Sequence, residues 1–214
     1  MADKISYSEY ALIDLLDAFA SNEPVPGGGS ASALAGAIGV SLLLMVAGLP
    51  KTRTGAPEEA TDLAEAAARL RPRRERLVEL VDEDSDAYRA LLAVFRLPKD
   101  TEAERAVRRE SVQAAMRPVT EAPLETMREC QQALAGAVIV ARNGHAAAAT
   151  DVAVAVELLA AAVRGSAMNV DANLESVADA GYQERIRTER QQLEADSTAD
   201  AERARESLRH GSRT

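Results

Sequence analysis

The sequence predicts an all-α protein, a multi-helix bundle with two closely packed core helices made of small residues. Three observations lead to this prediction. Alanine and leucine supply most of the apolar residues, which favours helices, and only 3% of the residues are aromatic. No segment alternates polar and apolar residues as a strand would. Two stretches, 30–49 and 146–163, are rich in small residues and nearly free of charge, so that two helices can pack closely.

The first predicted helix runs from about Ser6 to Ser21. Ser6 and Glu9 have the spacing of a capping box, which favours a helix start at this point. The apolar stripe that we expect to be buried recurs at helical spacing and consists of Leu12, Leu15, Leu16 and Phe19.

The segment 24–30, Pro-Val-Pro-Gly-Gly-Gly-Ser, organises the rest of the chain. Its prolines stiffen the loop, and its glycines permit positive φ or the close approach of another group. Ser30 is the predicted N-cap of a central helix over 30–49, which we expect to be buried on all sides and to offer free N–H groups at its start. A plain turn before a core helix, a membrane span and a nucleotide loop are the alternatives. The scarcity of large apolar residues disfavours the span, and the missing Gly-Lys-Ser/Thr disfavours the nucleotide loop.

A third helix is predicted over 57–95, with Pro72 kinking or breaking it. Asp84 stands in its core-facing seam, where a carboxylate must be paired, hydrogen-bonded or shifted in pKa. It is therefore either a structural residue or an active-site acid or base. We expect the neighbouring Asp82, Glu83 and Asp86 to be solvated. The seam follows alternating steps of four and three residues and contains Leu77, Val81, Asp84, Tyr88, Leu91 and Phe95.

Three further helices complete the prediction. A capping box at 101–104 opens a helix towards Val140, which Pro118 and Pro123 should divide or bend. After a turn at 142–144, a fifth helix begins at 146 and continues to Asn173 or beyond. The last helix spans about 181–209, and its part after Leu193 has few apolar residues, which predicts a solvated or partner-facing tail.

The composition narrows the class of protein. The length predicts one domain over 1–214, and the net charge of −9 argues against a nucleic-acid partner. The single cysteine, Cys130, cannot form a disulfide within the chain, which fits a reducing compartment, so a cytoplasmic location is expected. We expect Cys130 to be an ordinary side chain without a chemical role. No metal site is expected, because His145 and His210 are the only histidines.

The residues that could carry chemistry are few: the glycine loop, Asp84, Asp151, Asn169 and Asn173, with His145 nearby. Asp151 and Asn169 are eighteen residues apart on one helix, which is about 27 Å. Within one chain they cannot both touch one reacting atom. They serve different ends of a long ligand, or one is structural, or a symmetric dimer brings them into shared sites.

Four motifs together resemble the formiminotetrahydrofolate cyclodeaminase / methenyltetrahydrofolate cyclohydrolase family, and they occur in the family's order. His145 departs from that pattern, because family members often carry Asn after the glycine. The motifs are Pro-Val-Pro-Gly-Gly-Gly-Ser at 24–30, Asp-Ser-Asp-Ala-Tyr at 84–88 with Leu-Pro-Lys at 97–99, Gly144 followed by Thr150-Asp151, and Asn-Val-Asp-Ala-Asn-Leu at 169–174.

The resemblance implies an all-helical homodimer that binds a tetrahydrofolate derivative in a cleft near the dimer interface, with no metal or redox cofactor and no membrane or nucleic-acid partner. Asp84 and Asp151 match the family's aspartates and are the expected catalytic residues, one transferring protons and the other orienting the ligand or stabilising its charge. The expected substrate-binding residues are Pro26, Gly27, Gly28, Gly29, Ser30, Tyr88, His145, Asn169 and Asn173.

Two reactions fit this resemblance, because both pass through a tetrahedral carbon between two nitrogens. The expected one is hydrolysis of 5,10-methenyltetrahydrofolate to 10-formyltetrahydrofolate, since the chain is too short to hold a formiminotransferase domain as well. The alternative is deamination of 5-formiminotetrahydrofolate with ring closure to the methenyl compound. A helical folate-binding protein without catalysis is the alternative from another class.

Overall fold

The computed structural model describes residues 6–211, and side chains within 6–209, and this part of the chain is helical without a named strand. The all-α prediction is therefore confirmed. An isolated backbone bridge joins Thr52 to Gly144. The helical elements are η1 (Tyr7–Glu9), α1 (Leu12–Ala20), α2 (Gly28–Ala47), α3 (Pro57–Phe95), α4 (Glu102–Asn143), η2 (Ala146–Ala148), α5 (Ala149–Leu174) and α6 (Ala180–Gly211).

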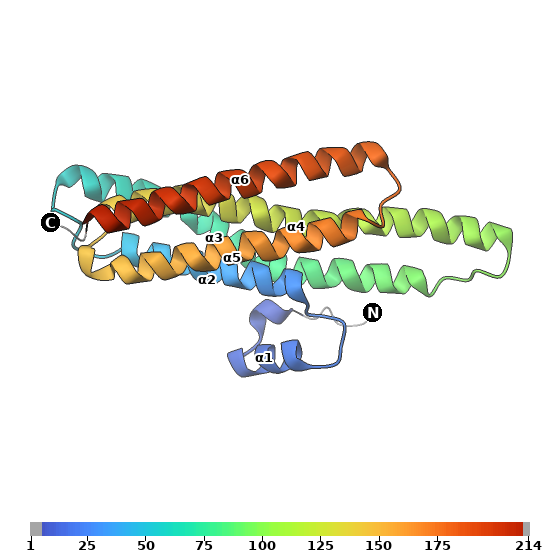
Figure 1. Cartoon of the computed structure of the whole chain (residues 1–214). Helices are drawn as coiled ribbons and strands as arrows, with labels where there is room; N and C mark the ends of the chain where they lie inside the picture. Colours follow the sequence, from blue (N-terminus) through green and yellow to red (C-terminus); the bar gives the residue numbers. More distant parts are fainter. Residues whose placement is uncertain (1–5, 212–214) are drawn as a thin grey trace.

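Five long helices form the bundle, and α1 stands apart from it (Figure 1). Helices α3 and α4 form a long hairpin whose connected end projects beyond the other helices. Helix α2 packs against α3, α4 and α5, and α6 lies along α4 and α5. Helix α1 lies beside the start of α2, to which the proline-glycine loop connects it (Figure 1).

The two small-residue helices, α2 and α5, pack closely, as predicted. A Cβ on Gly39 of α2 would lie 2.9 Å from Leu159 Cγ and 3.0 Å from the carbonyl oxygen of Ala155, both on α5. Only glycine allows the two backbones to approach this closely. The contact fixes α2 on the rest of the bundle, and with it the loop that opens the helix.

The prolines do not divide the long helices. Pro72 lies inside α3, and Pro118 and Pro123 lie inside α4, yet each helix is continuous. The buried side chains of Leu70 and Leu77 hold α3 on both sides of Pro72. Packing of these flanking turns outweighs the loss of one hydrogen bond at a proline.

The N-terminal segment differs from its prediction. Residues 7–9 form a 3₁₀ turn, Ser6 makes no capping bond to it, and α1 begins only at Leu12. In the predicted buried stripe Leu15 is buried and Phe19 half-buried, but Leu12 is 71% exposed and Leu16 51% exposed. The pattern was that of a buried helix, but α1 stands apart from the bundle, so most of its apolar side remains uncovered.

Asp82 was expected to be solvated, and that prediction is wrong. The residue is buried at 9% exposure, and its carboxylate accepts hydrogen bonds from the backbone N–H of Tyr7 and from the hydroxyls of Ser6 and Ser8. A buried carboxylate needs such donors, and these come from a part of the chain far away in sequence. Asp82 therefore anchors the N-terminal segment to α3.

The second half of α6 is also more buried than predicted. Its small side chains pack onto the bundle, with Ala201 2% exposed and Ala204 fully buried. Asp200 is buried beside them and accepts a hydrogen bond from Gln131 Nε2 at 3.2 Å. Small residues allow this helix to lie close to its neighbours, so few large apolar residues are needed to pack it.

Helix α2 is not buried on all sides, which corrects another prediction. On α2, apolar side chains spaced seven residues apart form an exposed row, in which Ile38 is 46% and Met45 43% exposed. A similar row runs along α5, where Val154 is 46% and Met168 69% exposed. We call these two rows the apolar face. It consists of Ala31, Ile38 and Met45 on α2 and of Val154, Ala161 and Met168 on α5.

By length and hydropathy alone, α2 and the segment 146–174 are suited to cross a membrane. About half of each apolar stretch, 50% and 44%, is buried inside the bundle. Core helices of soluble proteins have the same character, so the finding is weak evidence for a membrane location.

Candidate active site

The carboxylate of Asp84 lies at the first turn of α2. Its Oδ2 accepts a hydrogen bond from the backbone N–H of Ser30 at 2.9 Å and lies 3.1 Å from the Ser30 hydroxyl. An acceptor at this point satisfies a donor that has no partner within the helix, and the positive end of the helix favours its negative charge. Asp84 thus takes the role predicted for Ser30. Gly27 is the N-cap residue by position, and Ser30 lies in the first turn.

Gly29 makes this approach possible. A Cβ on Gly29 would lie 2.1 Å from Asp84 Oδ1 and 2.5 Å from its Cγ, so any side chain at this position would force the carboxylate to move. The glycine triplet thus supplies close approach, one of its two predicted properties. The other, positive φ, occurs within the described residues only at Gly55.

Burial raises the pKa of Asp84, and the hydrogen bonds from Ser30 oppose that rise. The Ser30 hydroxyl also lies 2.8 Å from the carbonyl oxygen of Val81. The hydroxyl can therefore donate a hydrogen bond to Val81 and accept one from a neutral Asp84, or donate one to the ionised carboxylate. The site accommodates both protonation states of Asp84 without moving a heavy atom, which general acid–base chemistry requires.

Ser85 is a member of this cluster that the sequence did not single out. It is fully buried, and its hydroxyl lies 3.0 Å from that of Ser30. Its place directly after Asp84, one step off the seam, was the only available signal.

Asn169 joins the same end of the bundle. A Cβ on Gly28 would lie 3.6 Å from Asn169 Nδ2, so this side chain lies beside the glycine loop. Its amide donates to the carbonyl oxygen of Gly165 at 2.8 Å, which orients the side chain. Tyr88 lies one helical turn after Asp84 on α3 and is 37% exposed. Asn173, one turn further along α5, donates through its amide to the carbonyl oxygen of Val119 on α4 at 2.8 Å.

Asp151 and His145 lie at the other end of the bundle. Both are half-buried near the start of α5. Gly144, next to His145, meets Val46 near the end of α2, whereas Asn169 meets the start of that helix. The structure therefore brings Asp84, the glycine loop, Tyr88 and Asn169 together and leaves Asp151 and His145 out of that group within one chain.

Other buried acidic groups have structural partners. Glu129 is 4% exposed, and burial raises its pKa, but Arg73 Nη1 donates to both of its carboxylate oxygens at 2.9 and 3.0 Å. Cys130 is buried and its thiol pKa is raised strongly, as befits an inert side chain. Among the described side chains, which do not include His210, no group of three His, Cys, Asp or Glu residues could hold a metal ion.

The fold and this site define a class of protein: a helical bundle in which a half-buried carboxylate meets the start of an uncharged helix opened by glycines. The family described as "Formiminotransferase-cyclodeaminase" matches residues 11–192. The chain belongs to this family.

Two relatives show how far the likeness extends. A methenyltetrahydrofolate cyclohydrolase of Methylorubrum extorquens is 33% identical over 194 residues, covering 91% of this chain and 93% of that protein. A formimidoyltransferase-cyclodeaminase of Gallus gallus is 29% identical over 78% of this chain but only 30% of its own length. A crystal structure of a formiminotetrahydrofolate cyclodeaminase from Thermotoga maritima superposes with a TM-score of 0.83 at 21% identity, covering 94% of this chain and 97% of the other, which shows a shared fold.

Proposed function

We propose that this protein hydrolyses 5,10-methenyltetrahydrofolate to 10-formyltetrahydrofolate. The observation that carries the proposal is the 33% identity to the Methylorubrum cyclohydrolase over nearly the whole of both chains. The half-buried carboxylate of Asp84 beside an uncharged helix start supplies a chemical group suited to that reaction.

The chemistry requires a base and a counter-charge. Water adds to the carbon that links two nitrogens of the cationic substrate, and the added water loses a proton. One carbon–nitrogen bond then breaks: the hydroxyl gives up its proton and becomes the formyl carbonyl on one nitrogen, and the nitrogen that leaves gains a proton. A carboxylate with a raised pKa is a stronger base than an ordinary aspartate, and its charge attracts the cation. We assign the proton transfer from water to Asp84. The proposed site also uses Pro26, the glycines 27–29 and Ser30 as a backbone cradle, with Tyr88 and Asn169 beside it.

A dimer would bring the second aspartate, Asp151, to the site of Asp84. Asp151 and His145 lie at the far end of α2 and α5 from Asp84, whereas the apolar face runs along both helices. A two-fold axis through this face, near Ile38 at the middle of α2, reverses the helix direction. It carries Asp151 of the partner subunit towards Asp84 of the first. In this arrangement Asp151 and His145 of the partner subunit complete the folate site. Asn173 stabilises the wall of that site through its hydrogen bond from α5 to Val119 on α4.

Deamination of 5-formiminotetrahydrofolate is the second candidate. It is favoured by the likeness to the Gallus protein, whose name includes cyclodeaminase. The same carboxylate serves this reaction, because ammonia leaves from the same kind of tetrahedral carbon. A folate-binding protein without catalysis is the third candidate. We propose a cytoplasmic homodimer that needs no metal or redox cofactor and binds neither nucleic acid nor membrane.

The first experiment is turnover of the purified protein. The rate of loss of the methenyl chromophore should exceed the spontaneous rate, and it should fall about 10²–10⁴-fold in Asp84→Asn. The formimino substrate is assayed in parallel, and formation of the chromophore from it would favour the deaminase instead. Binding of folate without turnover of either compound would favour the binding protein.

A complementation experiment tests the shared site. Asp84→Asn and Asp151→Asn chains should each be nearly inactive alone. When they are unfolded together and refolded, they should form mixed dimers with one intact site. Random association should restore about a quarter of the wild-type rate. Refolding each variant alone is the control. If the mixture stays as inactive as its parents, the two aspartates do not act across the interface.

A further inference from the structure

A second, basic pocket lies next to the candidate site on α3. It has a volume of about 460 Å³ and is formed between α3 and the loop that leads to the glycines. Its charged side chains are Arg89, Arg96 and Glu23, and Tyr7, Val25 and Leu92 provide most of its apolar wall.

The pocket is aligned with the Asp84 cluster. Ser85, Arg89, Leu92 and Arg96 recur in steps of four, three and four residues, so they form one stripe along α3. The stripe starts at Ser85, which contacts Ser30. Arg96 lies twelve residues after Asp84, a distance of about 18 Å along the helix. A ligand bound at Asp84 and lying along α3 would therefore have to extend over about this length to reach the pocket.

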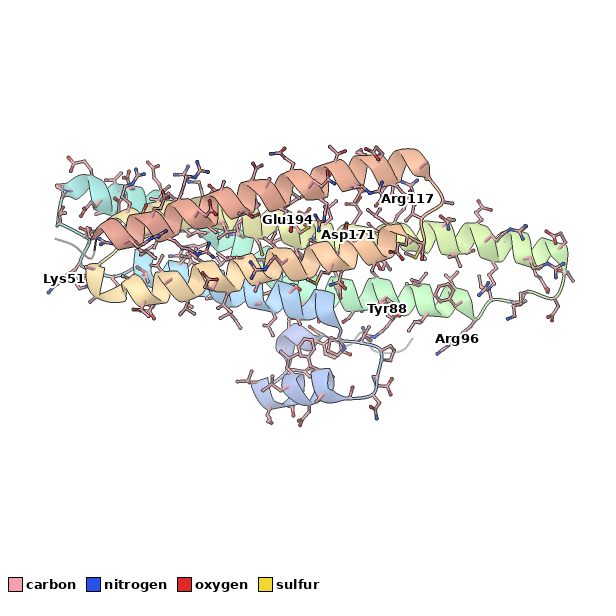
Figure 2. The ribbon with its side chains drawn as sticks, viewed as in Figure 1. Lys51, Tyr88, Arg96, Arg117, Asp171 and Glu194 are labelled. Carbon is pink, nitrogen blue, oxygen red and sulfur yellow. The ribbon has the colours of Figure 1, made fainter. Side chains whose placement is uncertain are left out.

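The two arginines have different roles. Arg89 is fixed in place, since it donates to the Tyr7 hydroxyl at 2.7 Å and to Asp86 Oδ1 at 2.8 Å, and it lies 5.1 Å from the centre of the Tyr7 ring. Arg96 is exposed and forms no ion pair with another described residue. Figure 2 shows Arg96 beyond Tyr88 along α3, pointing away from the bundle. An unpaired guanidinium beside a fixed one favours an anion, above all a carboxylate.

A parallel aromatic stripe accompanies the basic one. Tyr88 and Phe95 lie four and eleven residues after Asp84 on its side of α3, and they are 37% and 45% exposed. Aromatic rings that remain partly exposed offer a surface on which another flat ring can pack. From Asp84 outward, α3 thus presents a carboxylate, then Tyr88 beside Arg89, and then Phe95 beside Arg96.

We infer that this part of α3 binds the p-aminobenzoyl-glutamate arm of the folate, with the aromatic ring on Tyr88 and the glutamate carboxylates at Arg89 and Arg96. The inference rests on the proposed function, because a folate has this order of groups: a charged reacting centre, a flat ring and then a dicarboxylate. The Glu23 carboxylate at the same pocket repels the arm and limits its affinity.

The test measures how binding depends on the arm. Dissociation constants are determined by calorimetry for 5-formyltetrahydrofolate and for the corresponding pteroate, which lacks the glutamate. Arg96→Gln should raise the dissociation constant for 5-formyltetrahydrofolate about fivefold, which is the upper end of the effect of an exposed ion pair. The dissociation constant for the pteroate should not change. Glu23→Gln should change affinity in the opposite direction, towards tighter binding of the glutamate form only. Arg74→Gln, an exposed arginine on the same helix outside the pocket, is the matched control.

Kinetics provide the second measurement. Arg96→Gln should raise KM for the methenyl substrate and leave kcat within about twofold, because Arg96 is remote from the reacting carbon. Equal binding of the two compounds by the wild-type protein, or an equal effect of Arg96→Gln on both, would overturn the inference while turnover still supported the proposed function. If the protein binds neither compound, the proposed function fails and the inference fails with it.

Discussion

Asp84 experiences two opposing electrostatic effects, and its titration reveals which is larger. Burial raises its pKa above the ordinary value of 3.8 despite the bonds from Ser30. Between the unfolded and the folded pKa, the folded protein still holds a proton that the unfolded chain has released. The contribution of Asp84 to stability is therefore full at low pH, is lost as pH rises through this interval, and stays constant above it.

Asp84→Asn removes this dependence. The free energy of unfolding of the variant, minus that of the wild type, should increase as pH rises above about 4 and then level off. Urea unfolding at a series of pH values measures the difference. Asp196→Asn, an exposed change on α6, is the control and should give a difference that does not vary in this way. A difference that decreases with pH would mean that the bonds from Ser30 outweigh burial.

Gly28 and Gly29 offer a matched pair of substitutions. Gly29→Ala places a methyl group on the Asp84 carboxylate and must displace it, so we expect a loss of about 1–3 kcal/mol of stability together with most of the activity. Gly28→Ala meets Asn169 only at ordinary contact distance, and its stability should be nearly unchanged. Thermal unfolding and turnover of both variants measure the contrast. Equal effects of the two would mean that the close approach to Asp84 is unimportant.

At the residue scale, the sequence located the carboxylate but not its partner. The helical spacing of apolar residues was enough to place Asp84 in a core-facing seam, because this spacing depends only on the geometry of one helix. Ser30 was assigned to the helix cap for the same local reason. Its actual bonds, to Val81 and Asp84, join residues more than fifty positions apart. Such contacts follow from the packing of two helices and cannot be deduced from either one alone.

At the scale of elements, Asp82 connects the N-terminal segment to the bundle. Asp82→Ala removes the acceptor for the N–H of Tyr7 and the hydroxyls of Ser6 and Ser8, and it leaves these donors without their partner. Amide exchange at Tyr7 and Ser8 should accelerate about 5- to 150-fold, which corresponds to a loss of about 1–3 kcal/mol of local stability. Hydrogen exchange followed by mass spectrometry measures it.

Glu79→Gln, on the exposed side of the same helix, is the control for Asp82→Ala. It removes an ion pair with Arg76 and should leave exchange in the N-terminal segment unchanged. If exchange in that segment were equally slow in the Asp82→Ala protein, the contacts of the Tyr7 ring would be the stronger anchor.

The prolines show where local rules leave two outcomes open, a kinked helix or a broken one. Local rules predict that Pro72, Pro118 and Pro123 kink or interrupt a helix, and all three lie inside the continuous helices α3 and α4. Burial of neighbouring leucines is a property of the assembled bundle and outweighs the local preference. By contrast, the start of α4 was predicted correctly, because the Thr101–Glu104 capping box involves only adjacent turns.

At the scale of the whole molecule, the apolar face is the main prediction. Ile38→Asp places a charge at the centre of the proposed interface, where burial without a partner is unfavourable. The wild-type protein should elute as a dimer and the variant as a monomer of low activity, measured by size-exclusion chromatography with light scattering. Val107→Asp, at an exposed apolar position on α4, is the control and should remain dimeric. A monomeric wild type would overturn the shared site.

A single sequence cannot show which sides of an apolar helix are covered by its own chain. The absence of charge in α2 predicted burial on every side, but Ile38 and Met45 are exposed in the isolated chain. Burial within a chain and burial against a partner select the same residues, because both remove apolar surface from water. The distinction appears only when the other helices have been placed.

The exposed rows on α2 and α5 also have a thermodynamic consequence. When two subunits associate through these rows, the folded state draws part of its stability from association, and mass action then makes that part depend on protein concentration. Dilution would lower the melting temperature, and concentration would raise it. Enzyme made in small amounts in a cell would therefore be less resistant to heat and proteases than the same enzyme made in abundance. In such a dimer, the apolar face would link the lifetime of each subunit to the abundance of its partners.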